Sequence, residues 1–122
     1  MQLFLLLNHS LTQEQIQDLQ DLKVTEIIDL NTGKWGQIPP EMEDITPLLQ
    51  EYFTTLKNQA QKGDYLLVQG DFGATYQLVN FAKTLGLIPI YATTLRETKE
   101  TQNADGSIAK HSVFKHCRFR KY

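Results

Sequence analysis

A glycine-containing turn is the strongest chemical signal in the sequence. A short apolar run is followed directly by Gln69, Gly70, Asp71, Phe72, Gly73, Ala74 and Thr75. Glycines at a strand-to-helix junction let the backbone turn tightly and let a ligand approach closely. The helix that follows offers free N–H groups and the positive end of its dipole. We therefore interpret the stretch as a phosphate or nucleotide site, in which Phe72 stacks on a base and Gln69 or Thr75 hydrogen-bonds a phosphate or sugar.

The same turn also has a purely structural interpretation. Many strand-to-helix turns contain glycine, and Asp71 is a residue type that caps helices. Its carboxylate repels a phosphate unless it faces away from the ligand. The spacing of the glycines matches neither the Walker A loop nor the complete dinucleotide fingerprint.

His9 and Ser10 form a second candidate, because they follow the first apolar run of the chain. A histidine with an ordinary pKa of about 6.5 exchanges protons near neutral pH. At the end of a strand, His9 can take a proton from a ribose 2′-hydroxyl or give one to a leaving 5′-oxygen, while Ser10 binds a phosphate oxygen. In the alternative interpretation, His9 bonds a backbone group and Ser10 belongs to the loop before a helix.

Positive charge is concentrated near the C-terminus. Between Gly106 and Tyr122 no acidic residue interrupts the basic ones, which are Lys110, Lys115, Arg118, Arg120 and Lys121. This segment is either a basic wall beside an anion site or a solvated hairpin edge that discourages strand-to-strand aggregation. Arg96, Thr93 and Thr94 follow the fourth predicted strand and are expected at the same edge of the site.

Several classes of function are not supported. The three histidines are dispersed and the only cysteine is Cys117, so we expect no metal site, no disulfide within the chain and no cofactor. A net charge of −2 makes bulk attraction to long nucleic acids or anionic membranes unexpected. The first apolar run is far shorter than a membrane span. The single cysteine favours a reducing setting, so we expect a cytoplasmic protein.

The predicted strands and helices determine where the candidate site residues lie in the fold. Short apolar runs at 3–7, 65–69 and 87–91 are typical of strands buried on both faces, and residues 23–30 form a weaker fourth candidate. Helices are expected after Thr12, from about Ile45 to Leu56, and from Gly73 to about Leu85. Segments 93–102 and 107–120 flank an Asp-Gly turn and predict a hairpin, in which Val113, Cys117 and Phe119 share one face.

This alternation predicts one α/β domain over residues 1–122. We expect a three-layer sandwich whose parallel core sheet has the order 2-1-3-4, with the C-terminal β-hairpin added. In that order the first and third strands are neighbours, and a ligand crevice opens at their carboxyl ends. His9-Ser10 and the turn from Gln69 to Thr75 both lie at this edge.

At these residues the chain resembles a known family, the small type III CRISPR-associated proteins of the Csx-twenty group. The similar segments span nearly the whole chain and run from His9 to Gln15, Ile38 to Glu41, Val68 to Tyr76, Gly86 to Thr94 and Ser112 to Arg120. The Gln-Gly-Asp-Phe-Gly-Ala-Thr block is the most specific of them. The resemblance implies a Rossmann-like fold related to CARF sensor domains, and a homodimer that binds cyclic oligoadenylate, with cyclic tetra-adenylate as the expected ring. It also implies ring-nuclease activity that switches off antiviral signalling.

The catalytic residues are assigned from chemistry rather than from the resemblance. Attack of a ribose 2′-hydroxyl on its own 3′-phosphate needs no metal if the groups are oriented in line. We assign His9 as general acid or base, and expect Ser10, Arg96 and the amides of the turn to hold the phosphate. Two alternatives stay open: a sponge that sequesters the ring without cutting it, and a small nucleotide-binding or interaction module without a cyclic ligand.

Overall fold

The computed structural model describes all residues, 1–122, as an alternation of strands and helices that ends in two long strands. Their bounds are β1 (Gln2–Leu6), α1 (Gln13–Asp21), β2 (Glu26–Asp29), α2 (Thr46–Gln59), β3 (Tyr65–Val68), α3 (Phe72–Thr84), β4 (Ile88–Gln102) and β5 (Ile108–Lys121). None of the helices has the length and apolar character that crossing a membrane requires.

The five strands form one sheet in the order β2-β1-β3-β4-β5. The first four run parallel, so the predicted core order 2-1-3-4 is confirmed. β5 is added antiparallel to β4 at one end of the sheet. Leu6 lies opposite Val68, which makes β1 and β3 neighbours whose carboxyl ends meet at the same edge of the sheet.

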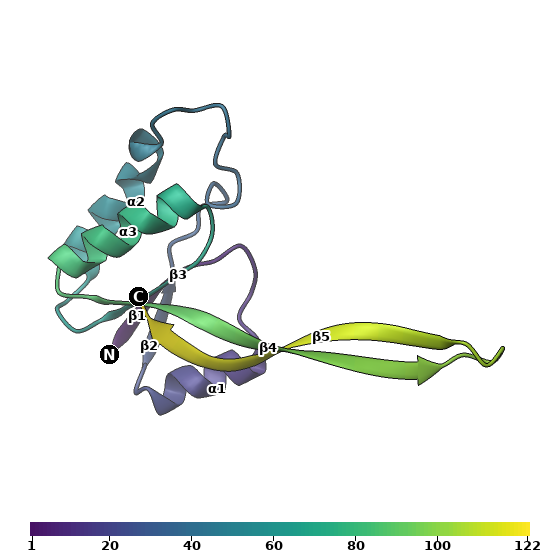
Figure 1. Ribbon diagram of the computed structural model, residues 1–122. Coiled ribbons are helices and arrows are strands. Elements are labelled where there is room, and N and C mark those ends of the chain that lie inside the picture. Colours follow the sequence, from purple (N-terminus) through teal and green to yellow (C-terminus); the bar gives the residue numbers. More distant parts are fainter.

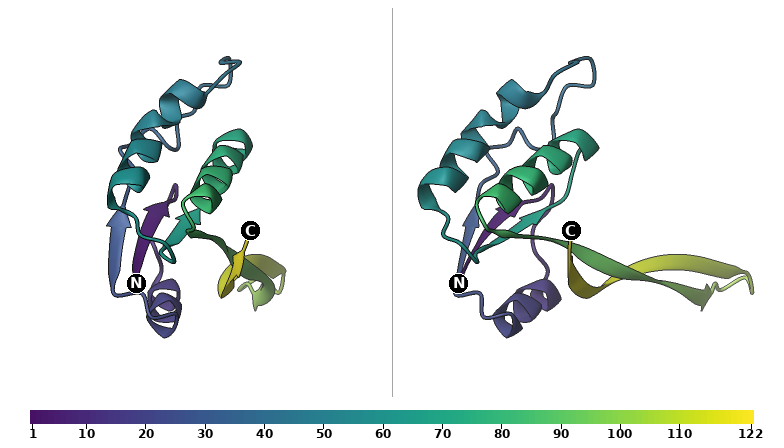
Figure 2. Two further views of the ribbon diagram at one scale, coloured as in Figure 1. Left: turned by 90° about the vertical axis from the view of Figure 1, so that its left-hand side faces the viewer. Right: turned by 60° about the vertical axis from the view of Figure 1, so that its left-hand side comes forward.

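Helices cover both faces of the parallel strands, as Figures 1 and 2 show. α2 and α3 lie together on one face, where a cluster of buried side chains includes Phe4, Leu6, Leu49, Leu66 and Leu78. α1 lies on the other face, where Leu19 packs with Leu3, Leu5, Leu67 and Phe119. The short apolar strands are therefore buried on both sides, as their composition predicts.

Local sequence explains where the helices begin. Thr12 and Gln15 form a capping box at the start of α1, in which each side chain accepts a hydrogen bond from the backbone N–H of the other residue. Pro47 lies in the first turn of α2, where the missing N–H costs no helical bond. Asp71 caps α3 by accepting from the N–H of Ala74 at 3.0 Å.

The sequence suggests a fourth strand at 87–91 and a separate hairpin strand at 93–102. In the structure these are one continuous strand, β4, which runs from the sheet into the hairpin. We call the paired segments 94–102 and 108–116, with the turn between them, the arm. Figure 1 shows the arm projecting away from the layered body. The predicted turn at Asp105-Gly106 is confirmed, with Gly106 at a φ of +87°.

A β-bulge corrects one prediction about this hairpin. Thr93 pairs with Arg118 but Thr94 pairs with His116, so Cys117 is the extra residue in β5. The extra residue changes the alternation of side chains along the strand. As a result Phe119 is buried in the core while Cys117 and Val113 are exposed, and the three do not share a docked face.

Candidate phosphate-binding turn at the carboxyl edge of the sheet

The two predicted segments leave neighbouring strands at the same edge. The N–H of Gln69 donates to the carbonyl of Leu6 at 3.1 Å, which continues the pairing of β1 and β3 to the point where both strands end. The phenol of Tyr122 donates to the carbonyl of Val68 and holds the end of β3 from the other side. Burial, with a smaller contribution from Tyr91, raises the pKa of Tyr122 above its usual value.

Trp35, from the loop after β2, packs at this edge. Its indole N–H donates to the carbonyl of Gln69 at 2.9 Å, and its side chain is fully buried, with its ring edge-on to Tyr52. A Cβ added at Gly70 would lie 2.6 Å from the indole nitrogen. Gly70 therefore makes room for Trp35, which gives this glycine a structural role besides the predicted one of letting a ligand approach.

The amides of the turn remain available to a ligand. The N–H groups of Gly70, Asp71, Phe72 and Gly73 have no hydrogen-bond acceptor within the chain, and all four residues are exposed. They lie before or within the first turn of α3, where the helix dipole adds positive potential. The side chain of Phe72 is 95% exposed beside them. This combination of free donors and an exposed aromatic ring can bind a phosphate and stack on a base.

Asp71, Ala74 and Thr75, which are also assigned to the site, have contacts that support the helix. The carboxylate of Asp71 is engaged as the cap of α3, which is the structural role that the sequence also allowed. Ala74 is fully buried and its N–H is the donor to that cap, so it offers no surface to a ligand. The N–H of Thr75 donates to the carbonyl of Asp71, while its hydroxyl is buried without a partner.

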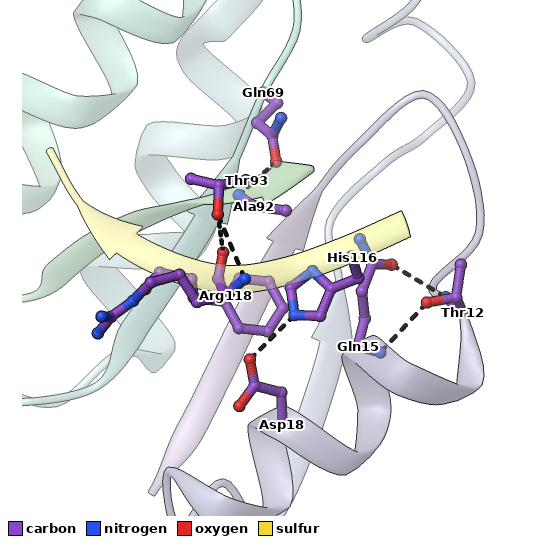
Figure 3. A network of polar contacts seen from close by, with 9 residues as sticks. Thr12, Gln15, Asp18, Gln69, Ala92, Thr93, His116 and Arg118 are labelled. Atoms are coloured by element: carbon purple, nitrogen blue, oxygen red, sulfur yellow. Dashed lines mark hydrogen bonds and ion pairs between the residues drawn. The ribbon is translucent and has the colours of Figure 1, made fainter. Parts of the chain in front are cut away.

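Gln69 and Thr93 are held by the sheet, as Figure 3 shows. The side-chain oxygen of Gln69 accepts from the N–H of Ala92 at 2.8 Å, which leaves its amide nitrogen as the free donor. The hydroxyl of Thr93 donates to the carbonyl of Arg118 at 2.8 Å and accepts from its N–H at 3.2 Å, so it bridges the bulge. The hydroxyl of Thr93 therefore has structural partners on both sides.

Thr94 and Arg96 lie on the arm rather than at the turn. Thr94 is exposed and pairs with His116 across the hairpin. The guanidinium of Arg96 donates twice to the hydroxyl of Ser112, at 3.2 and 2.9 Å. No contact within the chain joins Arg96 to the turn from Gly70 to Gly73.

His9 and Ser10 are exposed in the loop between β1 and α1. The ring Nδ1 of His9 lies 3.1 Å from the carbonyl of Ser10, which is the backbone contact that the alternative interpretation expected. The other ring nitrogen and the hydroxyl of Ser10 have no partner in the chain. Both groups are thus free to meet a ligand at this edge.

The largest hollows lie elsewhere, between α1 and the arm. One of about 520 Å³ is lined by Thr12, Gln13, Glu14, Glu97, Lys99, Val113, Phe114, Lys115 and His116. The second, of about 510 Å³, lies between α1 and the part of β5 that carries His116 and Cys117. Neither contains His9, Ser10 or the turn, so the crevice expected between β1 and β3 is not one of the two largest hollows of the chain.

His116 joins α1 to the arm, and sequence reasoning missed its role. Its Nε2 lies 2.9 Å from the carboxylate of Asp18, and its ring packs on Phe119. The side chain is 5% exposed, and Nδ1 has no partner (Figure 3). The two residues are 98 positions apart in sequence, and no local pattern signals the pair. No cluster of three or more His, Cys, Asp or Glu side chains suited to a metal ion is present.

Comparison with known proteins connects the chain to one family. The model of the "Uncharacterized protein MJ1673 family" matches residues 1–120. The chain belongs to this family. A curated relative, "Uncharacterized protein MJ1673" of Methanocaldococcus jannaschii, is 48% identical over 124 aligned residues, which cover 98% of this chain and 95% of the relative. No solved structure matches the chain significantly.

Proposed function

We propose that this protein is a ring nuclease that binds cyclic tetra-adenylate and cleaves it without a metal ion, as its resemblance to the Csx-twenty group implies. In this proposal the protein ends antiviral signalling by type III CRISPR systems. It is cytoplasmic and acts as a homodimer, and its α/β sheet is of the Rossmann-like, CARF-related type.

The free amides of Gly70, Asp71, Phe72 and Gly73 are the observation that carries the proposal. A phosphodiester has the negative oxygens that unpaired backbone donors at a helix start attract. The exposed ring of Phe72 offers a surface on which an adenine can stack. A site of this composition suits a nucleotide ligand better than an apolar or a cationic one.

Symmetry makes a ring a suitable substrate for two subunits. A cyclic tetranucleotide has rotational symmetry, and a two-fold dimer presents the same patch twice. Two equivalent phosphodiesters can then contact two equivalent turns. The ring would bridge the subunits, which is consistent with the exposed position of the turn outside the two largest hollows of the chain.

The proposed reaction is an internal transfer at phosphorus. The ribose 2′-oxygen attacks the adjacent 3′-phosphate, the bond from phosphorus to the 5′-oxygen breaks, and the product carries a 2′,3′-cyclic phosphate. The 2′-hydroxyl proton leaves to a base and the 5′-oxygen receives a proton, and His9 is assigned to one of these transfers. Orientation of the attacking oxygen can lower the barrier by about 7–11 kcal/mol, and the amides stabilise the charge that develops on the phosphorane.

A non-catalytic sponge for the same ring is the second candidate. The observation that favours it is the spread of the groups assigned to catalysis. Arg96 is bonded to Ser112 on the arm, and His9 has Nδ1 against a backbone carbonyl. The amides of the turn, by contrast, have no acceptor within the chain and can bind a phosphate without breaking a hydrogen bond.

Incubation with labelled cyclic tetra-adenylate in excess chelator separates these functions. Linear di-adenylate with a 2′,3′-cyclic phosphate end supports the ring nuclease, and tight binding of the intact ring supports the sponge. Absence of binding refutes both. In the His9→Ala variant we expect cleavage to be lost while ring binding is retained, and near-wild-type cleavage would exclude His9 from the mechanism.

A further inference from the structure

The arm leaves one long strand edge without a partner. β3 pairs with β4 only as far as Ile90, and from Thr94 to Gln102 the only neighbour of β4 is β5. A two-stranded hairpin without a third strand or a packed face is marginally stable in water. The arm nevertheless exposes large apolar side chains, with Leu95 at 56%, Ile108 at 63% and Phe114 at 67%. The arm therefore has both a free edge and apolar surface for a partner.

The charges on the two sides of Thr98 along this edge are complementary. The sequence from Arg96 to Glu100 reads Arg-Glu-Thr-Lys-Glu, so residues at equal distances on either side of Thr98 carry opposite charges. Within the chain Glu97 lies opposite Val113 and Lys99 lies opposite His111. Neither Glu97 nor Lys99 forms an ion pair within the chain, whereas Glu100 lies 3.9 Å from Lys110 and Arg96 donates to Ser112. Glu97 and Lys99 are therefore the charges left free for a partner.

From this pattern we infer that the free edge of β4 pairs antiparallel with the same edge of a second copy, with the two-fold axis at Thr98. In this register Glu97 lies opposite the partner's Lys99, and Arg96 lies opposite the partner's Glu100. The two-fold axis repeats both pairs. The two arms then form a four-stranded sheet in the order β5-β4-β4-β5, which supplies the strands that an isolated hairpin lacks.

The charges select this register and this edge. Moving the axis by one residue places Glu97 opposite the partner's Glu97, or Lys99 opposite the partner's Lys99. Like charges directly opposite each other destabilise a strand pair. β5, the alternative edge, carries five basic residues and no acid between Ile108 and Lys121. Self-pairing through β5 would therefore bring only like charges together, as in strands that resist edge association.

Charge reversal tests the pairing. We expect wild-type protein to form a dimer in size-exclusion chromatography with light scattering. Lys99→Glu alone, or Glu97→Lys alone, places like charges opposite each other twice and should weaken the dimer roughly tenfold or more. An equimolar mixture of the two single variants restores complementary pairs and should form a heterodimer, and one chain that carries both substitutions should form a homodimer again.

Lys115→Glu on β5 is the matched control and should remain dimeric. Circular dichroism establishes that each variant is folded before its mass is measured. A monomeric wild type, a dimer unaffected by Lys99→Glu, or a dimer lost in Lys115→Glu would each overturn the inference.

Cross-linking tests the register independently. In a Cys117→Ser background, Thr98→Cys places two sulfurs opposite each other at the axis and should give a covalent dimer on mild oxidation. Thr101→Cys is the control, because its two copies would be offset by six residues, or roughly 20 Å at about 3.4 Å per residue. Efficient cross-linking through position 101 and not through position 98 would contradict the register. Gln69, beside the turn, is bonded to Ala92, which is six residues from Thr98. Pairing about Thr98 therefore places the two turns roughly 40 Å apart at about 3.4 Å per residue, so it is a contact separate from the one that would share a ring. These measurements remain decisive whether or not the ring nuclease proposal holds.

Discussion

Replacement of Gly70 by alanine tests whether this glycine serves Trp35. The added Cβ would lie 2.6 Å from the indole nitrogen, 2.9 Å from Cε2 and 3.1 Å from Cζ2. The side chain of Trp35 is 1% exposed and edge-on to Tyr52, so the ring cannot move into solvent without opening the core. The substitution must therefore displace a buried ring or bend the turn.

The expected loss of stability follows from these contacts. Overpacking a core costs about 1–3 kcal/mol, and loss of the hydrogen bond from Trp35 to Gln69 adds about 0.5–1.5 kcal/mol. We expect Gly70→Ala to lower the free energy of unfolding by about 2–4 kcal/mol. In urea this moves the midpoint down by about 1–2 M. Trp35 is the only tryptophan, so its fluorescence reports the transition at the site of the change.

Gly73→Ala is the matched control in the same turn. Its added Cβ meets Asp71 Oδ2 at 3.5 Å and Ile45 Cδ1 at 3.6 Å, which are ordinary contacts. We expect a change within about 0.5 kcal/mol. In a Trp35→Phe background, followed by circular dichroism, Gly70→Ala should cost less, because neighbouring sites couple. A Gly70→Ala protein that unfolds at the wild-type urea concentration would refute the reasoning.

Three further substitutions have defined outcomes. Phe72→Ala should leave the free energy of unfolding unchanged, because the phenyl ring is 95% exposed. It should weaken the binding of cyclic tetra-adenylate, measured by calorimetry, by about 1–3 kcal/mol. Unchanged affinity would exclude stacking of an adenine on Phe72. Asp71→Ala removes the cap that accepts from Ala74 and should lower thermal stability by about 1 kcal/mol. Tyr122→Phe loses the hydrogen bond to Val68 and should cost about 0.5–1.5 kcal/mol at neutral pH. Because the pKa of Tyr122 is raised in the folded protein, its contribution is complete below pH 10.0, the usual tyrosine value, and is lost as the pH rises through the higher folded value. Stability curves of wild type and Tyr122→Phe should therefore converge in alkali, and parallel curves would contradict this.

Local sequence was sufficient for most of the fold. The apolar runs at β1, β3 and β4 gave the buried strands, because strands covered on both faces need continuous apolar residues. The capping residues Thr12 and Asp71 marked helix starts through bonds to backbone groups only three positions away. The alternation of strands and helices then restricted the sheet to few orders, and the predicted one is present.

Contacts between distant residues account for what was missed. Trp35 occupies the space beside Gly70, and the pairing of a glycine with a ring 35 positions earlier leaves no local pattern. The bulge at Cys117 reversed the expected faces of β5, because a single extra residue shifts every side chain beyond it. Arg96 was expected at the turn, but β4 continues into the arm and carries it to Ser112.

Amide chemical shifts of uniformly labelled protein, titrated with cyclic tetra-adenylate in excess chelator, test the central claim most directly. If the turn binds a phosphodiester, the largest changes will be at the N–H groups of Gly70, Asp71, Phe72 and Gly73, which have no partner in the free protein. Changes confined to the groove between α1 and the arm, or no changes at all, would contradict the assignment of this turn as the binding site.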